Sequence, residues 1–165
     1  MLEAAMMRKI IRSAAQRIPR SWLDVARERT GAAAVEFALV VPVFLMILMG
    51  MIQFGITINN YIELTNAVRV GGRQFAISRS NTTPWSTART AVTSAAMNLT
   101  AGSIAITLKV NGAACTSDAT CQTALGAAAG GAASVSATYP CDLTIMGINY
   151  FPSCSLASQN TEFIE

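Results

Sequence analysis

The stretch that decides the fold is TGAAAVEF at residues 30–37, which leads into the uncharged run FALVVPVFLMILMGMIQFGITI at residues 37–58. Gly31 ends a basic segment, three alanines and a valine follow it, and a lone carboxylate, Glu36, then stands beside Phe37. The run has 22 residues without a charge, and a helix of that length is about 33 Å long, enough to cross the hydrocarbon core of a bilayer. We therefore predict a membrane-spanning helix with a carboxylate near its head, where a charge is costly unless it finds a partner.

The composition agrees with a membrane protein that carries one small domain. Hydrophobic residues make up 52% of the 165 residues, and charged residues make up only 13%. This balance is more apolar than that of an ordinary soluble domain. The length allows one small domain in addition to a membrane segment.

The charges are distributed unevenly about the apolar run. Residues 1–31 hold seven basic and three acidic side chains, whereas residues 32–165 hold five basic and six acidic ones. Because basic flanks stay in the cytoplasm, we expect a cytoplasmic N-terminus and an external C-terminal part. We interpret residues 1–29 as this cytoplasmic flank; a mitochondrial transit peptide is the alternative, and the three acidic residues argue against it. No basic surface with aromatic or base-reading partners is evident, so we expect no nucleic-acid partner.

The cysteines and the absence of histidine point to a structural domain. Without histidine, the chain lacks the commonest general base and the commonest metal ligand, and we expect no enzyme activity, metal site or cofactor. The four cysteines all lie in the C-terminal third, which indicates disulfides in an oxidising compartment. They are Cys115, Cys121, Cys141 and Cys154. Three pairings are possible, and we prefer Cys115–Cys121 with Cys141–Cys154 because each closes a short local loop.

Helical character continues beyond the apolar run. Apolar and small residues recur there at steps of three and four, which is typical of one helix face. They are Ile58, Tyr61, Ile62, Thr65, Val68 and Phe75. We predict one helix from about residue 32 to about residue 79, with this stripe facing a small domain and with Gly71-Gly72 as a kink or an end point.

The rest of the chain predicts an α+β domain. Thr83-Pro84 is typical of a helix start, and the helix is expected to run to about Leu99. Alternating patterns predict strands at 103–110 and 134–139, with a weaker strand at about 154–164, a short helix at about 118–129 and a cysteine-flanked loop at 141–154. These elements predict a small antiparallel sheet packed on the outer half of the long helix. The expected divisions are a leader (1–31), a transmembrane helix (32–58), its external continuation (59–79) and a disulfide-containing α+β domain (80–165).

The segment GAAAVEFALVVP at residues 31–42 resembles the N-terminal signature of TadE-like proteins. These are minor pilins, or pseudopilins, of the tight-adherence (Tad/Flp, type IVc) pilus system. The resemblance extends through QFG at residues 53–55 to about Phe75, and it is weaker at 135–140 and 161–165. The signature is specific because it joins a glycine, a Glu-Phe pair, an uncharged 22-residue run and a basic leader.

The resemblance implies roles for the opening residues. In the family a prepilin peptidase cuts directly after the glycine, which places the scissile bond at Gly31–Ala32. Glu36 then becomes the acidic residue five places into the mature chain, and it is implied to act in assembly together with Phe37. Cleavage would create an α-amino group on Ala32, about one helical turn from Glu36 or close to the Glu36 of a neighbour.

The function implied is that of a TadE-like pseudopilin or minor pilin that takes part in assembly of an adhesion pilus. The expected partners are the prepilin peptidase, other Tad pilins, the inner-membrane assembly platform and the lipid bilayer. The expected location is the bacterial inner membrane, with the pilin-like C-terminal domain in the periplasm. The alternative function is that of an uncleaved, signal-anchored envelope protein that binds a periplasmic partner. For Glu36 itself, the alternative to an assembly role is a carboxylate in the headgroup region, near the helix entrance, that pairs with Arg27 or Arg29.

Overall fold

The computed structural model describes residues 29–145 and 147–165. The predicted basic leader therefore lies mostly outside the described residues. The chain divides into two units, Met1–Ile47 and Leu48–Glu165, which we describe separately. In the first unit, the described part is the beginning of helix α3, which runs from Arg29 to Ala76 and contains Pro42.

The predicted long helix is confirmed, since α3 is 48 residues long and is followed by the short 3-10 helix η1 (Ile77–Ser80). The predicted end point at Gly71-Gly72 is wrong, because α3 passes through both glycines. Their role is to allow close packing. A Cβ on Gly71 would overlap the Cγ2 of Val92, and one on Gly72 would lie 2.6 Å from the Nδ2 of Asn160.

The predicted apolar stripe on α3 is only partly correct. Val68 and Phe75 are fully buried, but Ile58, Tyr61 and Ile62 have exposed fractions of 58%, 46% and 53%. The face that the domain covers is set by residues at helical spacing, all of them buried. They are Leu64, Ala67, Val68, Gly71, Gly72, Phe75 and Ala76. The sequence pattern failed here because apolar residues also occur beyond Ile58, at positions such as Tyr61 and Ile62, on faces of the helix that the domain does not cover.

The second unit contains a four-stranded antiparallel sheet in the order β2–β1–β3–β6. Its strands are β1 (Ala105–Val110), β2 (Ala113–Cys115), β3 (Ala132–Pro140) and β6 (Ser155–Phe163). The sheet confirms the predicted fold class. Strand β2 was not predicted, because three residues show no alternation; it forms because Asn111 (φ 48°) and Gly112 (φ 85°) turn the chain back beside β1.

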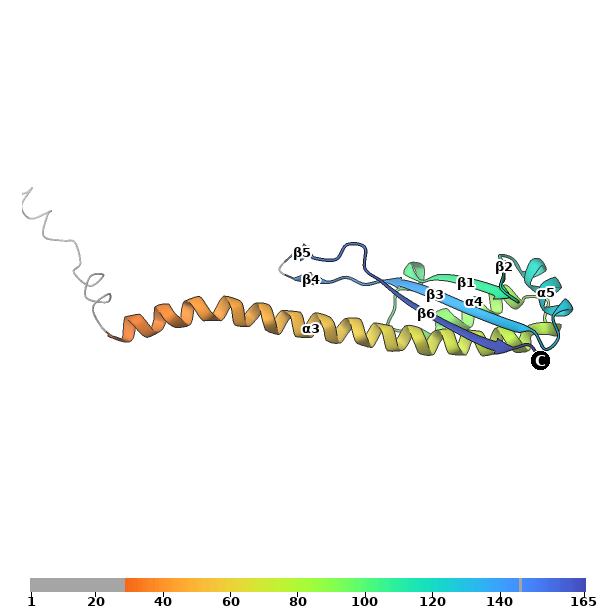
Figure 1. Cartoon of the computed structure of the whole chain (residues 1–165), viewed down its shortest axis with the longest axis horizontal. Helices are drawn as coiled ribbons and strands as arrows, with labels where there is room; N and C mark the ends of the chain where they lie inside the picture. The colour runs from red at the N-terminus through yellow and green to blue at the C-terminus, as the bar shows by residue number, and fades with distance from the viewer. Residues whose placement is uncertain (1–28, 146) are drawn as a thin grey trace, which may run out of the picture. The chain divides into compact units, whose positions relative to one another are not determined.

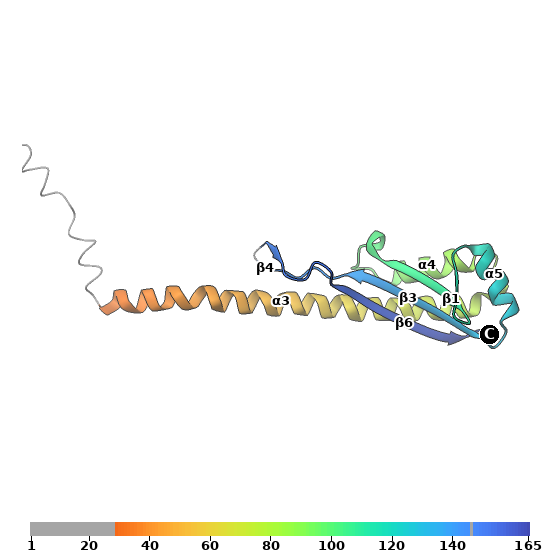
Figure 2. The same cartoon turned by 45° about the horizontal axis from the view of Figure 1, so that its top comes forward.

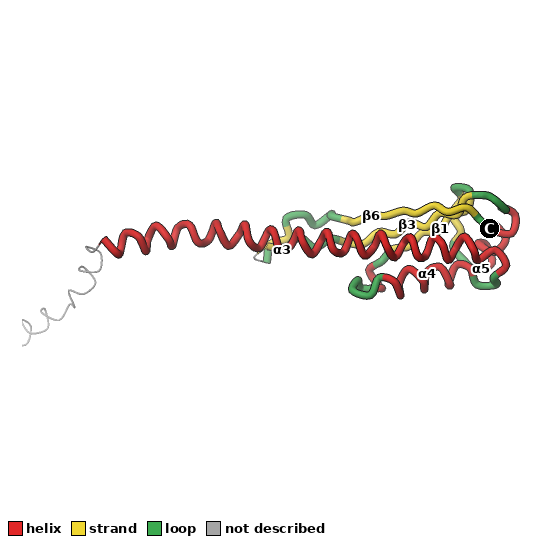
Figure 3. Tube along the Cα trace, turned by 90° about the horizontal axis from the view of Figure 1, so that it is seen from below, coloured by secondary structure: helices red, strands yellow, loops and turns green. Residues whose placement is uncertain are grey.

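This unit also contains the α-helices α4 (Pro84–Ala95) and α5 (Asp118–Ala127) and the short 3-10 helix η2 (Ala101–Ser103). Helix α4 ends four residues before the predicted end at Leu99. Figure 3 shows the strands on one side of α3 and α4 on the other side in that view. Contacts of Gly71 with α4 and of Gly72 with β6 agree with this arrangement, so the C-terminal half of α3 is held between the two layers.

The core of this unit lies where the sheet meets the helices. Alternate residues of β1 and β3 point into it, as their sequence patterns predict; the buried ones include Leu108, Val110, Ala133, Val135 and Ala137. β3 and β6 lie side by side along the C-terminal half of α3 in both Figure 1 and Figure 2. Nine residues of each strand pair in register, from Ala132 with Phe163 to Pro140 with Ser155.

The connection between β3 and β6 is a short hairpin of its own. Strands β4 (Thr144–Ile145) and β5 (Ile148–Asn149) pair antiparallel within it. We call residues 141–154 the cysteine loop, because Cys141 and Cys154 stand at its base. In Figure 1 the loop lies beyond the ends of β3 and β6, farther from the C-terminus.

Candidate functional site

The bond Gly31–Ala32 lies in helix α3, two residues after Arg29, where the described part of the helix starts. Glycine has a low helix propensity, about 1 kcal/mol below alanine. Gly31 therefore lowers the cost of unwinding the helix at this bond.

The side chains of Glu36 and Phe37 are both exposed on α3. Glu36 is exposed, and Phe37 has an exposed fraction of 70%. The alternative partners Arg27 and Arg29 lie where the structure describes no side chains, so that interpretation of Glu36 stays a prediction. An exposed carboxylate next to an exposed aromatic ring leaves both groups available for contacts with another molecule.

The residues that follow make α3 a membrane-length apolar helix. The helix is long and apolar enough to cross a membrane, and none of its most apolar part is buried inside the chain. Large exposed side chains on the uncharged run include Leu39, Phe44, Ile47 and Ile52, with exposed fractions between 52% and 71%. Such a surface is unfavourable in water. The helix is therefore compatible with a single-pass membrane anchor.

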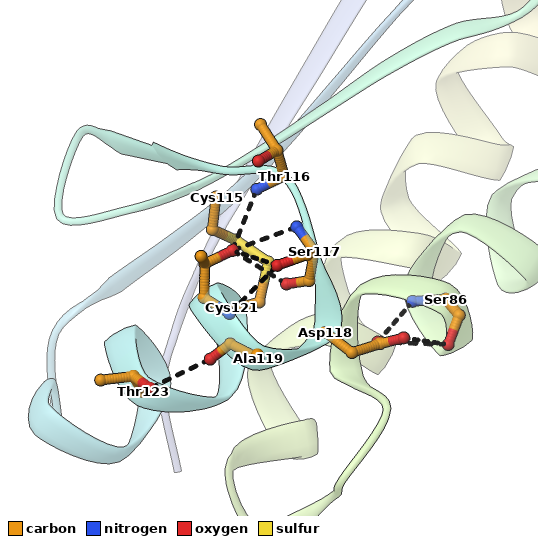
Figure 4. The surroundings of a disulfide bond; sticks show 9 residues. Ser86, Cys115, Thr116, Ser117, Asp118, Ala119, Cys121 and Thr123 are labelled. Atoms are coloured by element: carbon orange, nitrogen blue, oxygen red, sulfur yellow. Dashed lines mark hydrogen bonds between the residues drawn. A yellow bond between two sulfur atoms is a disulfide. The ribbon is translucent and has the colours of Figure 1, made fainter.

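The cysteines form two disulfides, Cys115–Cys121 and Cys141–Cys154, with Cα–Cα distances of 5.1 Å and 5.3 Å. This is the pairing that the short loops favoured. The first disulfide lies in the core, where Cys115 is 5% exposed and Cys121 is fully buried. It connects β2 to the first turn-and-a-half of α5, as Figure 4 shows.

A polar contact beside this disulfide was not anticipated from the sequence. Thr83 stands at the N-cap of α4 but its side chain makes no capping bond. Instead the Oδ1 of Asp118, on α5, accepts a hydrogen bond from the Ser86 N–H at 2.9 Å, and the Ser86 hydroxyl also donates to the carboxylate (Figure 4). A carboxylate at a helix N-terminus satisfies a free amide and interacts favourably with the helix dipole. The two helices are thereby tied together.

A second unanticipated contact ties the cysteine loop to α3. The Nε2 of Gln53 donates a hydrogen bond of 2.9 Å to the carbonyl of Thr144, 91 residues away in the chain. Gln53 lies inside the uncharged run of residues 37–58. The only signal in the sequence was a polar amide within that run, and the partner of such an amide cannot be inferred from spacing.

Comparison with known proteins identifies the N-terminal segment. The family model described as TadE-like protein matches residues 31–73. No curated protein and no solved structure matches the chain. The family match confirms the resemblance over this segment, which starts at Gly31 and includes Glu36, Phe37 and most of α3.

Proposed function

From the premise that residues 31–73 carry the TadE-like segment, we propose that this chain is a pseudopilin or minor pilin that takes part in assembly of a Tad/Flp-type adhesion pilus. A prepilin peptidase cleaves it after Gly31. The chain is a substrate of that enzyme and has no catalytic role of its own. It resides in the bacterial inner membrane, with residues 1–31 in the cytoplasm and the disulfide-containing domain in the periplasm.

One observation carries the proposal. The family match begins at Gly31, the residue on which the cleavage assignment depends, and an exposed carboxylate follows five positions later at the head of an exposed apolar helix. A carboxylate that entered a bilayer or a helix bundle unpaired would cost a few kcal/mol, about 2.5–3.5 on translocon insertion scales. A partner charge created by cleavage removes most of that cost.

The partner is the α-amino group of Ala32. A positive amine at the N-terminus of a helix is opposed by the helix dipole, which is also positive at that end. A nearby carboxylate therefore stabilises an amine at the N-terminus of a helix more than it would stabilise an amine that is not attached to a helix. Glu36 lies four residues from Ala32, which places the two groups on one helix face about 6 Å apart along the axis. In an assembly, the amine of one chain can equally meet the Glu36 of the next.

The flanking residues suit close helix association. Residues 32–34 are three alanines, and small side chains let helix backbones approach closely in a membrane. Phe37, beside Glu36, offers apolar contact area to a neighbour. The proposed partners are thus other Tad pilins through residues 32–58, together with the peptidase, the assembly platform and the lipid bilayer.

The test is expression of a C-terminally tagged chain with and without the cognate prepilin peptidase, followed by N-terminal sequencing. The expected mature chain starts at Ala32, and a bulky replacement such as Gly31→Leu prevents its formation. Gly102→Leu, in the exposed 3-10 helix Ala101–Ser103 with open space around the glycine, is the control that should be processed normally. An intact Met1 terminus in peptidase-positive cells would overturn the proposal.

The second candidate is an uncleaved, signal-anchored envelope protein that binds a periplasmic partner. The length and apolar surface of α3 are equally compatible with it. The same sequencing experiment separates the two, because this candidate keeps Met1 whether or not the peptidase is present.

A further inference from the structure

The cysteine loop presents apolar side chains on its exterior. Ile148, Tyr150 and Phe151 have exposed fractions of 59%, 55% and 60%. In the whole segment 141–154 the only charged residue is Asp142, which stands next to Cys141 at the base of the loop. Its carboxylate accepts hydrogen bonds from the Thr144 hydroxyl and, at 3.4 Å, from the side-chain amide of Asn149. The single charged side chain therefore lies at the base of the loop, and the part of the loop farthest from the base is apolar.

The loop lies beside a defined level of α3. Gln53 holds the carbonyl of Thr144, and a groove of about 250 Å³ lies between the helix and the loop. Gly50 and Phe54 line the helix side of this groove, and Leu143, Ile145, Tyr150 and Phe151 line the loop side. Residues 50–54 belong to the uncharged run that ends at Ile58. Gln53 therefore lies about 7.5 Å inside the outer end of that run.

Part of the backbone of the loop is hydrogen-bonded, as an apolar environment favours. In lipid, unpaired N–H and C=O groups cost several kcal/mol each. Here β4 pairs with β5, the Tyr150 N–H donates to the Leu143 carbonyl, and the Cys141 N–H donates to the Cys154 carbonyl. The Thr144 carbonyl, on the side of the strand that faces α3, is satisfied by Gln53. The loop is closed at its base by the disulfide Cys141–Cys154.

We propose that the cysteine loop inserts into the outer leaflet of the bilayer beside residues 50–54 of α3, and that the groove between them accepts a lipid acyl chain. The depth of the loop in the bilayer is set by its attachment to residues 50–54, which lie in the membrane-spanning part of α3. This inference therefore rests on the membrane anchor in the proposed function. Exposed tyrosine and phenylalanine at this level suit the boundary between headgroups and acyl chains. The loop then acts as a second anchor, which limits rotation of the periplasmic domain about the axis of α3.

The experiment uses the full chain in vesicles of phosphatidylcholine and phosphatidylglycerol, with the photo-reactive residue p-benzoylphenylalanine in place of one phenylalanine at a time. Position 151 tests the loop. Position 163 is the matched control, because Phe163 is 78% exposed and ends β6 at the other end of the sheet. Position 44, in the middle of the uncharged run, reports whether the helix itself is in lipid. Mass spectrometry after irradiation identifies the adduct at each position.

The expected result is a lipid adduct at positions 44 and 151, with at least several-fold less lipid adduct at 163. If position 44 reacts with lipid but 151 reacts no more than 163 does, the loop proposal is wrong and the membrane anchor stands. An adduct at 151 with a second copy of this chain instead of lipid also overturns it. If position 44 gives no lipid adduct, the anchor fails, and the proposed function fails with it.

Discussion

Asp118, on α5, caps helix α4: its Oδ1 accepts a hydrogen bond of 2.9 Å from the backbone N–H of Ser86, 32 residues away in the sequence. The same residue opens α5, whose own N-cap, Ser117, forms a capping box with Thr120. Asp118 also lies inside the short loop closed by Cys115–Cys121. One disulfide-bound turn therefore fixes the starts of two helices, and α4 depends on a carboxylate from a distant element for its N-terminal cap.

The first prediction concerns this cap. We expect Asp118→Ala to destabilise the α+β domain by about 1–2 kcal/mol, since it removes an acceptor for an orphan helix amide and a favourable charge at two helix starts. Urea unfolding of the full chain in detergent micelles, followed by circular dichroism, measures the loss. Hydrogen exchange distinguishes an effect on α4 from one on α5, because loss of the cap raises the exchange rate of the Ser86 amide in α4.

The control for this prediction is Asp118→Asn, which keeps an acceptor oxygen in the same place and should lose much less stability. Unchanged protection of the Ser86 amide in Asp118→Ala would show that the carboxylate does not cap α4.

The second prediction concerns the close approach of α3 and α4. Gly71→Ala ought to destabilise the domain by about 1–3 kcal/mol, because the added Cβ overlaps the Cγ2 of Val92, a fully buried residue that is stiff at χ1 in a helix. Combining it with Val92→Ala should cost clearly less than the sum of the two single changes, since the smaller side chain makes room. Strict additivity in the unfolding free energies would contradict the contact.

A glycine in open space provides the comparison for Gly71. Gly126, in α5, has nothing within 4 Å of a Cβ built on it. Gly126→Ala should therefore leave stability unchanged or raise it by up to about 1 kcal/mol, as helix propensity alone predicts.

The third prediction separates the two disulfides. Replacing Cys115 and Cys121 together with alanine should lower the unfolding free energy of the whole domain by about 2 kcal/mol or more, because the cross-link is lost and both sulfurs leave the core. The paired alanine replacement of Cys141 and Cys154 should act mainly on the cysteine loop, raising hydrogen exchange in β4 and β5 while β1 stays protected. Equal loss of protection in β1 from both pairs would contradict this division.

The fourth prediction concerns Glu36. Glu36→Val should still be cleaved after Gly31, because the scissile bond lies five residues upstream, but it should not co-purify with other pilins, since the new α-amino group has lost its partner. Glu63→Gln is the matched control on the same helix. Each carboxylate oxygen of Glu63 accepts one hydrogen bond from Asn98, and the amide oxygen of glutamine can still accept one of the two. Normal piliation with Glu36→Val would remove the proposed assembly role.

The sequence predicted the elements whose signals are local. The uncharged run, the alternation in β1 and β3, Pro84 at the start of α4 and the short cysteine spacings each depend on neighbours within a few residues. The family resemblance at residues 31–73 is local in the same sense, because it depends on consecutive residues. These signals were sufficient for the fold class, and the cleavage and assembly roles assigned to Gly31, Glu36 and Phe37 stay predictions.

Only the tertiary structure decided which face of α3 meets the domain. The sequence stripe included Ile58, Tyr61 and Ile62, which are exposed, and it omitted Leu64, which is fully buried. On a helix that is apolar on all sides in its first half, periodicity cannot mark one face as the core. Gly71 and Gly72 indicate the covered face instead, because Val92 and Asn160 pack against them. These two packing partners lie far away in the chain.

The stretch TGAAAVEF and the residues after it determined by themselves that residues 31–37 lie in a helix, that Glu36 precedes the uncharged run and that this run has membrane length, because each of these depends on residue type and order alone. The tertiary structure decided that Asp118 caps α4, that Gln53 holds the cysteine loop, and that the loop lies beside residues 50–54. These contacts join residues 32 to about 100 positions apart, and their geometry exists only after the sheet has brought the segments together.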